Sequence, residues 1–253
     1  MDAIQAGTIV FGGASGLGEA AARRLASAGA DVVVADLDTE RGPEVAKAIG
    51  GRFIRVDVTD SETVQAAAEA AAEAERGLRI SVCCAGIGPP AKIVGNDGAA
   101  PFDHYESVIR VNLLGTINAL RLCAAAMIAN PPEEDGERGV CVNTASIAAY
   151  EGQIGQTAYA ASKGGVVGVT LPAARDLAQH GVRVVTVAPG LFDTPLLRSL
   201  PEAAREALGK TIPFPPKLGE PERFAELVEH VVANPMLNGE VIRLDGALRM
   251  APR

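Results

Sequence analysis

Residues 7–18 read GTIVFGGASGLG. The first five favour a strand because most of them are β-branched or aromatic, and the alanine-rich pattern that continues to about residue 28 favours a helix. Glycines permit a tight turn and a close backbone approach, while the start of a helix presents unpaired N–H groups to an anion such as a pyrophosphate. A glycine turn alone is weak evidence for such a site, since any tight turn uses glycine. The stretch therefore predicts a strand, a turn and a helix, and the residues beyond this helix decide whether the turn binds an anion.

An acidic residue closes the next predicted strand, over residues 31–35. This residue, Asp36, comes eighteen positions after Gly18. A carboxylate at that place can accept two hydrogen bonds from the free hydroxyls of a ribose, and it repels a 2′-phosphate. Neither Ser15 nor Leu37 is an arginine that would attract such a phosphate. The order of strand, glycine turn, helix, strand and acid therefore predicts NAD, rather than NADP, as the cofactor.

Strand and helix patterns continue to alternate along the chain. This alternation is typical of an α/β domain with a doubly wound, seven-stranded parallel sheet and helices on both faces, which binds ligands outside the carboxyl ends of its strands. No linker or repeat divides residues 1–253, so we expect a single domain, with a proline-punctuated lid at about residues 191–219 that contains a short helix near residues 202–208. The predicted strands are 7–11, 31–35, 53–56, 80–84, 139–144, 182–187 and 240–244.

Composition limits the classes of partner. The chain has 253 residues, 48% of them hydrophobic, and a net charge of −8, which disfavours nucleic acids and anionic membranes. No uninterrupted apolar run reaches about 18 residues and the N-terminus does not look like a targeting signal, so we expect a cytoplasmic protein with no membrane partner. The four cysteines lie in apolar stretches and the three histidines are far apart, which predicts reduced thiols and no metal site.

Tyr159 and Lys163 are the candidate acid/base pair. Residues four apart share one face of a helix, and this helix is predicted to begin near residue 156 or 157. A free tyrosine is a poor acid or base at neutral pH because its pKa is about 10, and a neighbouring cation favours the phenolate. Ser146, thirteen positions before Tyr159, supplies an uncharged donor. The alternative for an isolated pair is a half-buried tyrosine and a solvated lysine.

Asn112 is a further candidate, in the middle of a helix predicted over residues 103–129. Its position is equally compatible with a special role and with plain solvation.

In order and spacing, the glycine loop, Asn112, Ser146 and the pair Tyr159 and Lys163 resemble the short-chain dehydrogenase/reductase family over essentially the whole chain. The resemblance implies a Rossmann fold and a hydride-transfer enzyme in which Tyr159 is the acid/base and Ser146 orients the carbonyl or alcohol. It also implies that Lys163 binds the nicotinamide ribose and tunes Tyr159, and that Asn112 anchors a water in the proton relay. Two departures are Phe11, where many members have threonine, and Cys83-Cys84, where Asn-Asn is usual.

Within this family, the segments NTAS (143–146), EGQ (151–153), PGLF (189–192) and NGEVIRLDG (238–246) most resemble members that act on 3-hydroxyacyl-CoA in fatty acid metabolism. The resemblance implies an NAD-dependent interconversion of 3-hydroxyacyl-CoA and 3-oxoacyl-CoA. The implied NAD contacts are Gly12, Ser15, Gly16, Leu17, Gly18, Asp36, Asp57, Val58, Cys84, Ala85, Gly86, Tyr159, Lys163, Pro189, Gly190, Phe192 and Thr194. The implied substrate contacts are Ser146, Gln153, Tyr159 and Leu196.

Two surfaces of the predicted fold are apolar. The lid can line a trough for an acyl chain, or it can simply pack onto the domain, while the CoA portion would lie near the 88–101 loop and basic groups such as Lys92 or Arg198. The trough residues are Leu191, Phe192, Pro195, Leu196, Leu197, Leu200, Ile212, Pro213 and Phe214. The helices around Asn112 and Tyr159 have apolar residues on more than one face, which together with the resemblance predicts a homotetramer. These residues are Leu113, Leu114, Ile117, Leu120, Leu122, Val166, Val167 and Val169.

Three other functions remain open from the sequence. A hydroxysteroid or other secondary-alcohol dehydrogenase would use the same acid/base set. A 3-oxoacyl reductase would prefer NADPH, against which Asp36 argues. A non-catalytic protein that senses a dinucleotide is the remaining alternative, but it would have no reason to keep Ser146, Tyr159 and Lys163 together.

Overall fold

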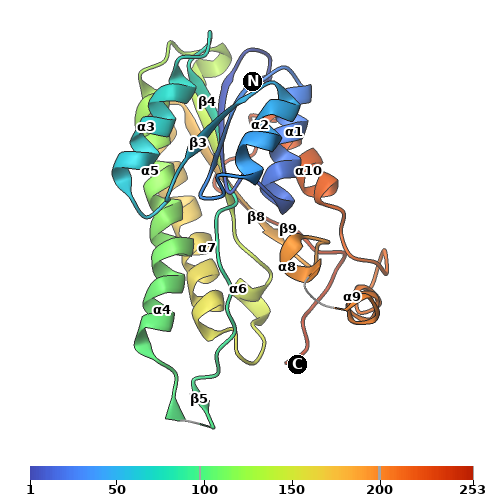
Figure 1. Ribbon diagram of the computed structural model, residues 1–253. Coiled ribbons are helices and arrows are strands. Elements are labelled where there is room, and N and C mark those ends of the chain that lie inside the picture. Colours follow the sequence, from blue (N-terminus) through green and yellow to red (C-terminus); the bar gives the residue numbers. More distant parts are fainter. Residues whose placement is uncertain (97, 199–200, 253) are drawn as a thin grey trace.

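A computed structural model describes residues 1–96, 98–198 and 201–252, with the side chains of Leu196 and Arg198 outside that description. Its main sheet has seven parallel strands in the order β3-β2-β1-β4-β7-β8-β9 (Figure 1). The strands are β1 Gly7–Phe11, β2 Asp31–Asp36, β3 Arg52–Arg55, β4 Leu78–Cys83, β7 Gly139–Thr144, β8 Val182–Pro189 and β9 Val241–Leu244. The predicted doubly wound sheet is confirmed, and each strand begins and ends within two residues of its predicted bounds.

Helices cover both faces of this sheet (Figure 1). On β7, Val140 and Val142 face one apolar core and Cys141 faces the other, as expected for a parallel strand that is buried on both sides. The first face is covered by α1 Gly16–Ser27, α2 Arg41–Ile49 and α10 Pro221–Ala233. The second face is covered by α3 Ser61–Ala72, α5 Gly115–Ile128 and α7 Thr157–Ala178. A single α/β domain results.

The strand order places the predicted site residues at one edge. From β1 the chain passes outward through β2 and β3, and then returns to β4 on the other side of β1. The loops that follow β1 and β4 therefore diverge, which opens a crevice outside the carboxyl ends of the strands. The turn containing Ser146 follows β7 at this same edge, because all seven strands run parallel.

The helix predicted over residues 103–129 is continuous but not uniform. It consists of α4 Phe102–Ile109, a π-helical turn at Arg110–Leu114, and α5. Over Phe102–Ile128 it is long and apolar enough to cross a bilayer, with a mean hydropathy of 1.5, although half of its most apolar stretch is buried inside the protein. A Cβ added to Gly115 would lie 2.5 Å from Val58 Cγ2, so this helix packs directly on the core. Half-burial and this contact are what a core helix requires.

Some elements were not predicted. The loop after β4 contains a small hairpin, β5 Val94–Gly95 and β6 Gly98–Ala99, which projects beyond α4 (Figure 1). Short helices α6 Ala148–Glu151 and α8 Pro195–Arg198 follow β7 and β8, whereas α9 Glu202–Gly209 was predicted. Asp193 N donates to Gly219 O and Gly219 N donates to Leu191 O, both at 2.8 Å, so the two ends of the predicted lid are tied together.

Candidate active site

The glycine loop forms a tight cradle at the end of β1. Gly12 has a φ of 73°, and its N–H donates to Ala35 O at 2.8 Å. A Cβ there would lie 2.7 Å from Ala85 N, and a Cβ on Gly18 would clash with Gly12 O. Only glycine fits at these two positions, so the backbone of the loop lies directly against the end of β4. Ser15 is the N-cap of α1, and the unpaired N–H groups at the start of a helix are suited to bind a pyrophosphate.

Asp36 is held against this loop. Its Oδ2 accepts from Ala14 N at 2.9 Å, and its Oδ1 accepts from Asp38 N at 3.0 Å. A carboxylate oxygen accepts more than one hydrogen bond, so both oxygens keep capacity for the hydroxyls of a ribose. The backbone therefore fixes the orientation of Asp36, and together with the glycine cradle it fits an adenosine ribose and its pyrophosphate.

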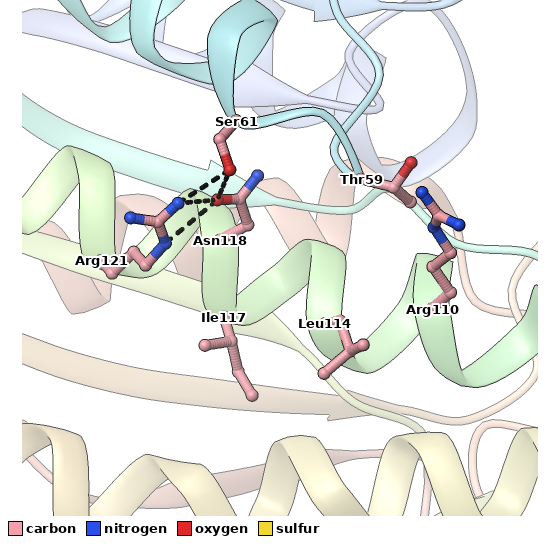
Figure 2. Close-up of a pocket in the computed structure, with 7 residues that line it drawn as sticks. All are labelled: Thr59, Ser61, Arg110, Leu114, Ile117, Asn118 and Arg121. Carbon is pink, nitrogen blue, oxygen red and sulfur yellow. Dashed lines mark hydrogen bonds between the residues drawn. The ribbon is translucent and has the colours of Figure 1, made fainter. Parts of the chain in front are cut away.

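Asp57 and Val58 follow β3 at the same edge. Asp57 Oδ1 accepts from Thr59 N at 2.9 Å and from Thr59 Oγ1 at 2.8 Å, which shapes the turn. Val58 is buried, and its carbonyl accepts from Asn118 Nδ2 at 2.9 Å. Asn118 also lines a surface hollow between α3 and α5, where its Oδ1 accepts from Arg121 (Figure 2). The hollow contributes to the site only as the support behind Val58.

Lys163 is deeply buried next to Tyr159. Its side chain is 4% exposed, and Nζ donates to Thr144 O at 2.8 Å and lies 5.8 Å from the centroid of the Tyr159 ring. The alternative of a solvated lysine is therefore wrong. An ammonium has three donors, so two remain for a ligand. The structure thus places a positive charge, shielded from solvent, beside the tyrosine ring.

The turn after β4 reaches across to this pair. A Cβ on Gly86 would lie 3.5 Å from Lys163 Nζ, and a Cβ on Gly88 would lie 3.3 Å from Tyr159 Cδ2. The structure thus brings Gly86 to the buried ammonium and Ala85 to the glycine loop, and both were predicted as cofactor contacts.

Ser146 lies at the carboxyl end of β7. Its neighbours in the chain are bound to β8, with Ala145 N donating to Val187 O at 2.8 Å and Ile147 N donating to Pro189 O at 3.1 Å. Ser146 Oγ accepts from Ala148 N at 3.1 Å. The hydroxyl is therefore oriented by the backbone, and its own hydrogen is available to a substrate oxygen.

An ion pair braces the turn after Ser146. Arg243 donates from Nη1 and Nη2 to the two carboxylate oxygens of Glu151, at 2.8 and 2.9 Å. These hydrogen bonds hold the pKa of Glu151 below its usual range, so the carboxylate stays charged at neutral pH. Two residues on, Gln153 Nε2 donates to Ala251 O at 3.0 Å. The C-terminal segment therefore packs against the predicted substrate residue Gln153, whose role in binding stays a prediction.

Asn112 is a clamp with no solvent exposure. Its Oδ1 accepts from Ile87 N at 2.8 Å, while Nδ2 donates to Ile87 O at 2.8 Å and to Ser162 Oγ at 3.0 Å. Ser162 Oγ in turn donates to Tyr159 O at 2.7 Å. The solvated alternative is wrong, and both amide hydrogens are already used. A relay water would have to bind to Oδ1 or to the main chain, so that role stays a prediction.

Sequence reasoning missed Ser162. The only signal was its spacing, three residues after Tyr159 and one before Lys163, which places it on the face of the helix that meets Asn112. Its hydroxyl joins the loop after β4, the π-helical turn and the tyrosine helix.

Replacing Ser162 by alanine is expected to destabilise the protein by about 1 to 2 kcal/mol, because one buried N–H of Asn112 loses its acceptor. Urea unfolding followed by circular dichroism measures the change. Ser107→Ala is the matched control, since Ser107 Oγ makes a similar bond to His104 O on an exposed helix surface. Equal effects of the two substitutions would contradict the clamp.

Cys84 occupies the position where related chains usually have asparagine. Its Sγ accepts from Thr144 Oγ1 at 3.4 Å, and its N–H donates to Phe11 O at 2.8 Å. Burial raises the pKa of the Cys84 thiol to about 12, so it stays protonated at neutral pH. All four cysteines are free, as predicted. A neutral thiol thus supports Thr144, the residue whose carbonyl holds Lys163.

The segment after β8 closes the remaining side. Gly190 N donates to Leu244 O at 2.9 Å, and a Cβ on Gly16 would lie 3.5 Å from Thr194 Cγ2, so this segment faces the glycine loop. Phe192 is buried in the core, so packing accounts for its position better than a role in lining an exposed surface for a ligand. Leu200 and the side chain of Leu196, both predicted to line the trough, lie outside the described residues.

The predicted acyl trough is partly a packing surface. Ile212 is buried against Ile147 and Leu248, and Leu191 packs on the same cluster. Phe214 is 79% exposed. For Ile212 and Leu191 the packing alternative therefore holds at least in part, although Ile147 directly follows Ser146 and brings the cluster to the site.

Comparisons with known proteins agree over nearly the whole chain. A family model described as short chain dehydrogenase matches residues 7–205. The 3-hydroxyacyl-CoA dehydrogenase type-2 of Drosophila melanogaster is 52% identical over 249 residues, which cover 97% of this chain and 98% of that protein. The human protein of the same name is 49% identical over 248 residues, covering 96% and 95%. The crystal structure of 3-hydroxyacyl-CoA dehydrogenase type-2 from Mycobacterium avium matches with a TM-score of 0.94 and 48% identity, covering 97% of this chain and 96% of that one.

The site fits this relationship. The glycine cradle and the anchored Asp36 suit the dinucleotide that dehydrogenases of this kind use, and a buried lysine lies beside a tyrosine. The chain therefore belongs to the short-chain dehydrogenase family and is an oxidoreductase with a nicotinamide dinucleotide cofactor.

Proposed function

We propose that the protein interconverts 3-hydroxyacyl-CoA and 3-oxoacyl-CoA with NAD, and that residues 1–253 act as one catalytic domain. The observation that carries the proposal is the buried Lys163 ammonium, held by Thr144 O and placed beside Tyr159. The substrate class is supported by the names of the relatives from fly and human, each of which matches over at least 95% of its own length.

The residues of this chain then divide the chemistry between them. When bound, the nicotinamide accepts or supplies the hydride. Tyr159 takes the proton of the 3-hydroxyl group during oxidation and returns it during reduction. Ser146 donates its free hydrogen to the substrate oxygen and fixes its position. Lys163 uses its remaining donors for the ribose, and it places a positive charge beside the Tyr159 ring.

Asp36 selects the cofactor in this proposal. Its two oxygens are aimed by Ala14 N and Asp38 N, and they can accept from both hydroxyls of the adenosine ribose. A 2′-phosphate would replace one of these donors and bring a negative charge next to the carboxylate. Both effects favour NAD.

Acetoacetyl-CoA is expected to be reduced with NADH at a kcat/KM well above that for any steroid or short free ketone, because the acyl-CoA class matches the relatives. Absorbance of NADH reports the reaction directly, and the panel includes a steroid ketone, a simple ketone and NADPH. No turnover of acetoacetyl-CoA with strong activity on a steroid or a simple ketone would assign the protein to another branch of the family. A preference for NADPH would favour a 3-oxoacyl reductase. Binding of NADH without turnover of any substrate would favour a dinucleotide sensor.

The acyl chain is proposed to lie along Leu191 and Ile212 above Tyr159. The CoA portion is proposed to extend toward the 88–101 loop, where Lys92 is exposed. Anionic phosphates near an exposed cation need no deep basic pocket.

We also propose a homotetramer. Leu114 is 54% exposed and Leu171 is also exposed, on the long helices that carry Asn112 and Tyr159, although Leu120 and Val166 of the predicted set are buried in the protomer itself. Exposed large apolar residues on neighbouring helices are typical of an interface between copies.

Sedimentation equilibrium is expected to give about four times the protomer mass at micromolar concentration. Leu114→Glu should shift the distribution toward smaller species, whereas Met236→Glu, at an exposed apolar position after α10, should leave it unchanged. A monomer in the parent protein would contradict the proposal.

We place the enzyme in the cytoplasm, since its four free cysteines suit a reducing compartment. Its net charge of −8 favours neither nucleic-acid nor membrane partners.

A further inference from the structure

Arg41 lies beside the turn that carries Asp36. Asp38 N donates to Asp36 Oδ1 at 3.0 Å, and Asp38 Oδ1 accepts from Arg41 N at 2.8 Å. Two backbone contacts thus connect the predicted ribose acceptor to the first residue of α2. The main chain of an arginine is therefore bound to the Asp36 turn, although neither Ser15 nor Leu37 is an arginine.

The Arg41 guanidinium is already bound to Glu19. Arg41 Nη2 donates to Glu19 Oε1 and to Oε2, both at 2.9 Å. Glu19 is in the first turn of α1, directly after the glycine loop, and α1 and α2 pack side by side on the same face of the sheet (Figure 1). The Glu19 carboxylate is 16% exposed and also binds Arg23 at 2.8 Å. Burial raises the pKa of Glu19, but the hydrogen bonds from Arg41 and Arg23 outweigh it and leave the pKa below its usual value.

We propose that Glu19 is a second determinant of cofactor selectivity, because it holds the Arg41 guanidinium away from a 2′-phosphate on the ribose beside Asp36. The inference rests on the proposed use of NAD and adds a residue to it. Asp36 repels the phosphate, and Glu19 withholds a nearby cation that would attract it.

Charge arithmetic supports this division. Glu19, Asp36, Asp38 and Glu44 place four carboxylates around the turn, and Arg41 and Arg23 supply two cations, both of them paired with Glu19. Glu44 is a more distant and more exposed partner of Arg41, at 3.7 Å. Glu19 offsets the charge of the Arg41 guanidinium and holds it in one orientation through Nη2, so Arg41 gains less from a second anion than an unpaired guanidinium, which turns freely to form charge-assisted bonds to a phosphate. Removing Asp36 alone therefore leaves both of these arginines bound to Glu19 and unavailable to the phosphate.

The test uses two small probes that report the 2′-phosphate without turnover: adenosine 2′,5′-bisphosphate and 5′-AMP, both titrated calorimetrically. In an Asp36→Ala background, Glu19→Gln is expected to lower the Kd of the bisphosphate by about 10-fold and to change that of 5′-AMP by less than about 2-fold. Glu19→Ala is included because a glutamine oxygen can still accept from Arg41. Adding Arg41→Met should abolish the gain, and adding Arg23→Met should not.

Glu229→Gln is the matched control. Glu229 pairs with Arg24 on the same helix α1, so the substitution removes the same charge from a similar pair elsewhere on the surface. An equal gain from Glu229→Gln, a gain that survives Arg41→Met, or no gain from either Glu19 variant would overturn the inference. These results are separable from a failure of the proposed function, in which the parent protein would bind 5′-AMP poorly or prefer NADPH. Thermal melts confirm that each variant is folded.

Discussion

Replacing Tyr159 by phenylalanine is expected to lower kcat by about 10² to 10⁴-fold or more, because the substitution removes the proton carrier of the reaction. Only one oxygen atom is lost, and the contacts that hold the helix involve the Tyr159 main chain, whose carbonyl accepts from Ser162 Oγ at 2.7 Å. The fold and the affinity for NADH should therefore stay nearly unchanged. Reduction of acetoacetyl-CoA measures kcat, and the change in NADH fluorescence measures binding.

Tyr105→Phe provides the control for this substitution. Tyr105 lies on α4 with its ring edge-on to His104, so the same atom is removed away from Lys163. Its activity should match that of the parent protein. A Tyr159→Phe enzyme with near-normal turnover would refute the acid/base assignment, while the family membership would stand.

The second large effect concerns the choice between NADH and NADPH. The parent enzyme is expected to prefer NADH by about 10²-fold or more in kcat/KM, since a 2′-phosphate removes one hydrogen bond to Asp36 and places like charges together. Asp36→Ala combined with Leu37→Arg should reduce this ratio strongly. Leu37 is 52% exposed, so the new guanidinium would reach the ribose without disturbing the core.

Asp31→Ala is the control for cofactor choice. Asp31 begins the same strand, β2, and pairs with Arg52 at the opposite end from the ribose position. It should leave the cofactor ratio unchanged. Equal kcat/KM values for NADH and NADPH in the parent protein would contradict the role of Asp36.

Local patterns predicted most of the fold because they act over a few residues. β1 and β7 begin and end where periodicity and turn residues place them, and Asp60, whose residue type favours N-caps, caps α3. The tight turn after β1 could be predicted from its glycines, because only glycine tolerates the close approach of Gly12 to the end of β4.

Features that depend on distant partners could not be predicted in the same way. Asn112 was ambiguous because its partner Ile87 is 25 residues away in the loop after β4. The link from Glu19 to Arg41 spans 22 residues and needs α1 and α2 to pack together. The π-helical turn has only five residues, too few for a change of helical period to show in the sequence, and the β5 and β6 hairpin has too few residues per strand to show alternation.

The position of β1 between β2 and β4 also determines how the protein must fold. Thr8 is paired with Val32 on one side and with Ile80 on the other. During synthesis or refolding, β1, β2 and β3 can associate early, but the second edge of β1 stays open until the chain has closed a much longer loop. That edge is apolar and unpaired in the interval, which makes it a template for association with other chains. The strand order that opens the dinucleotide crevice therefore makes the N-terminal half of the chain prone to aggregation until β4 is in place.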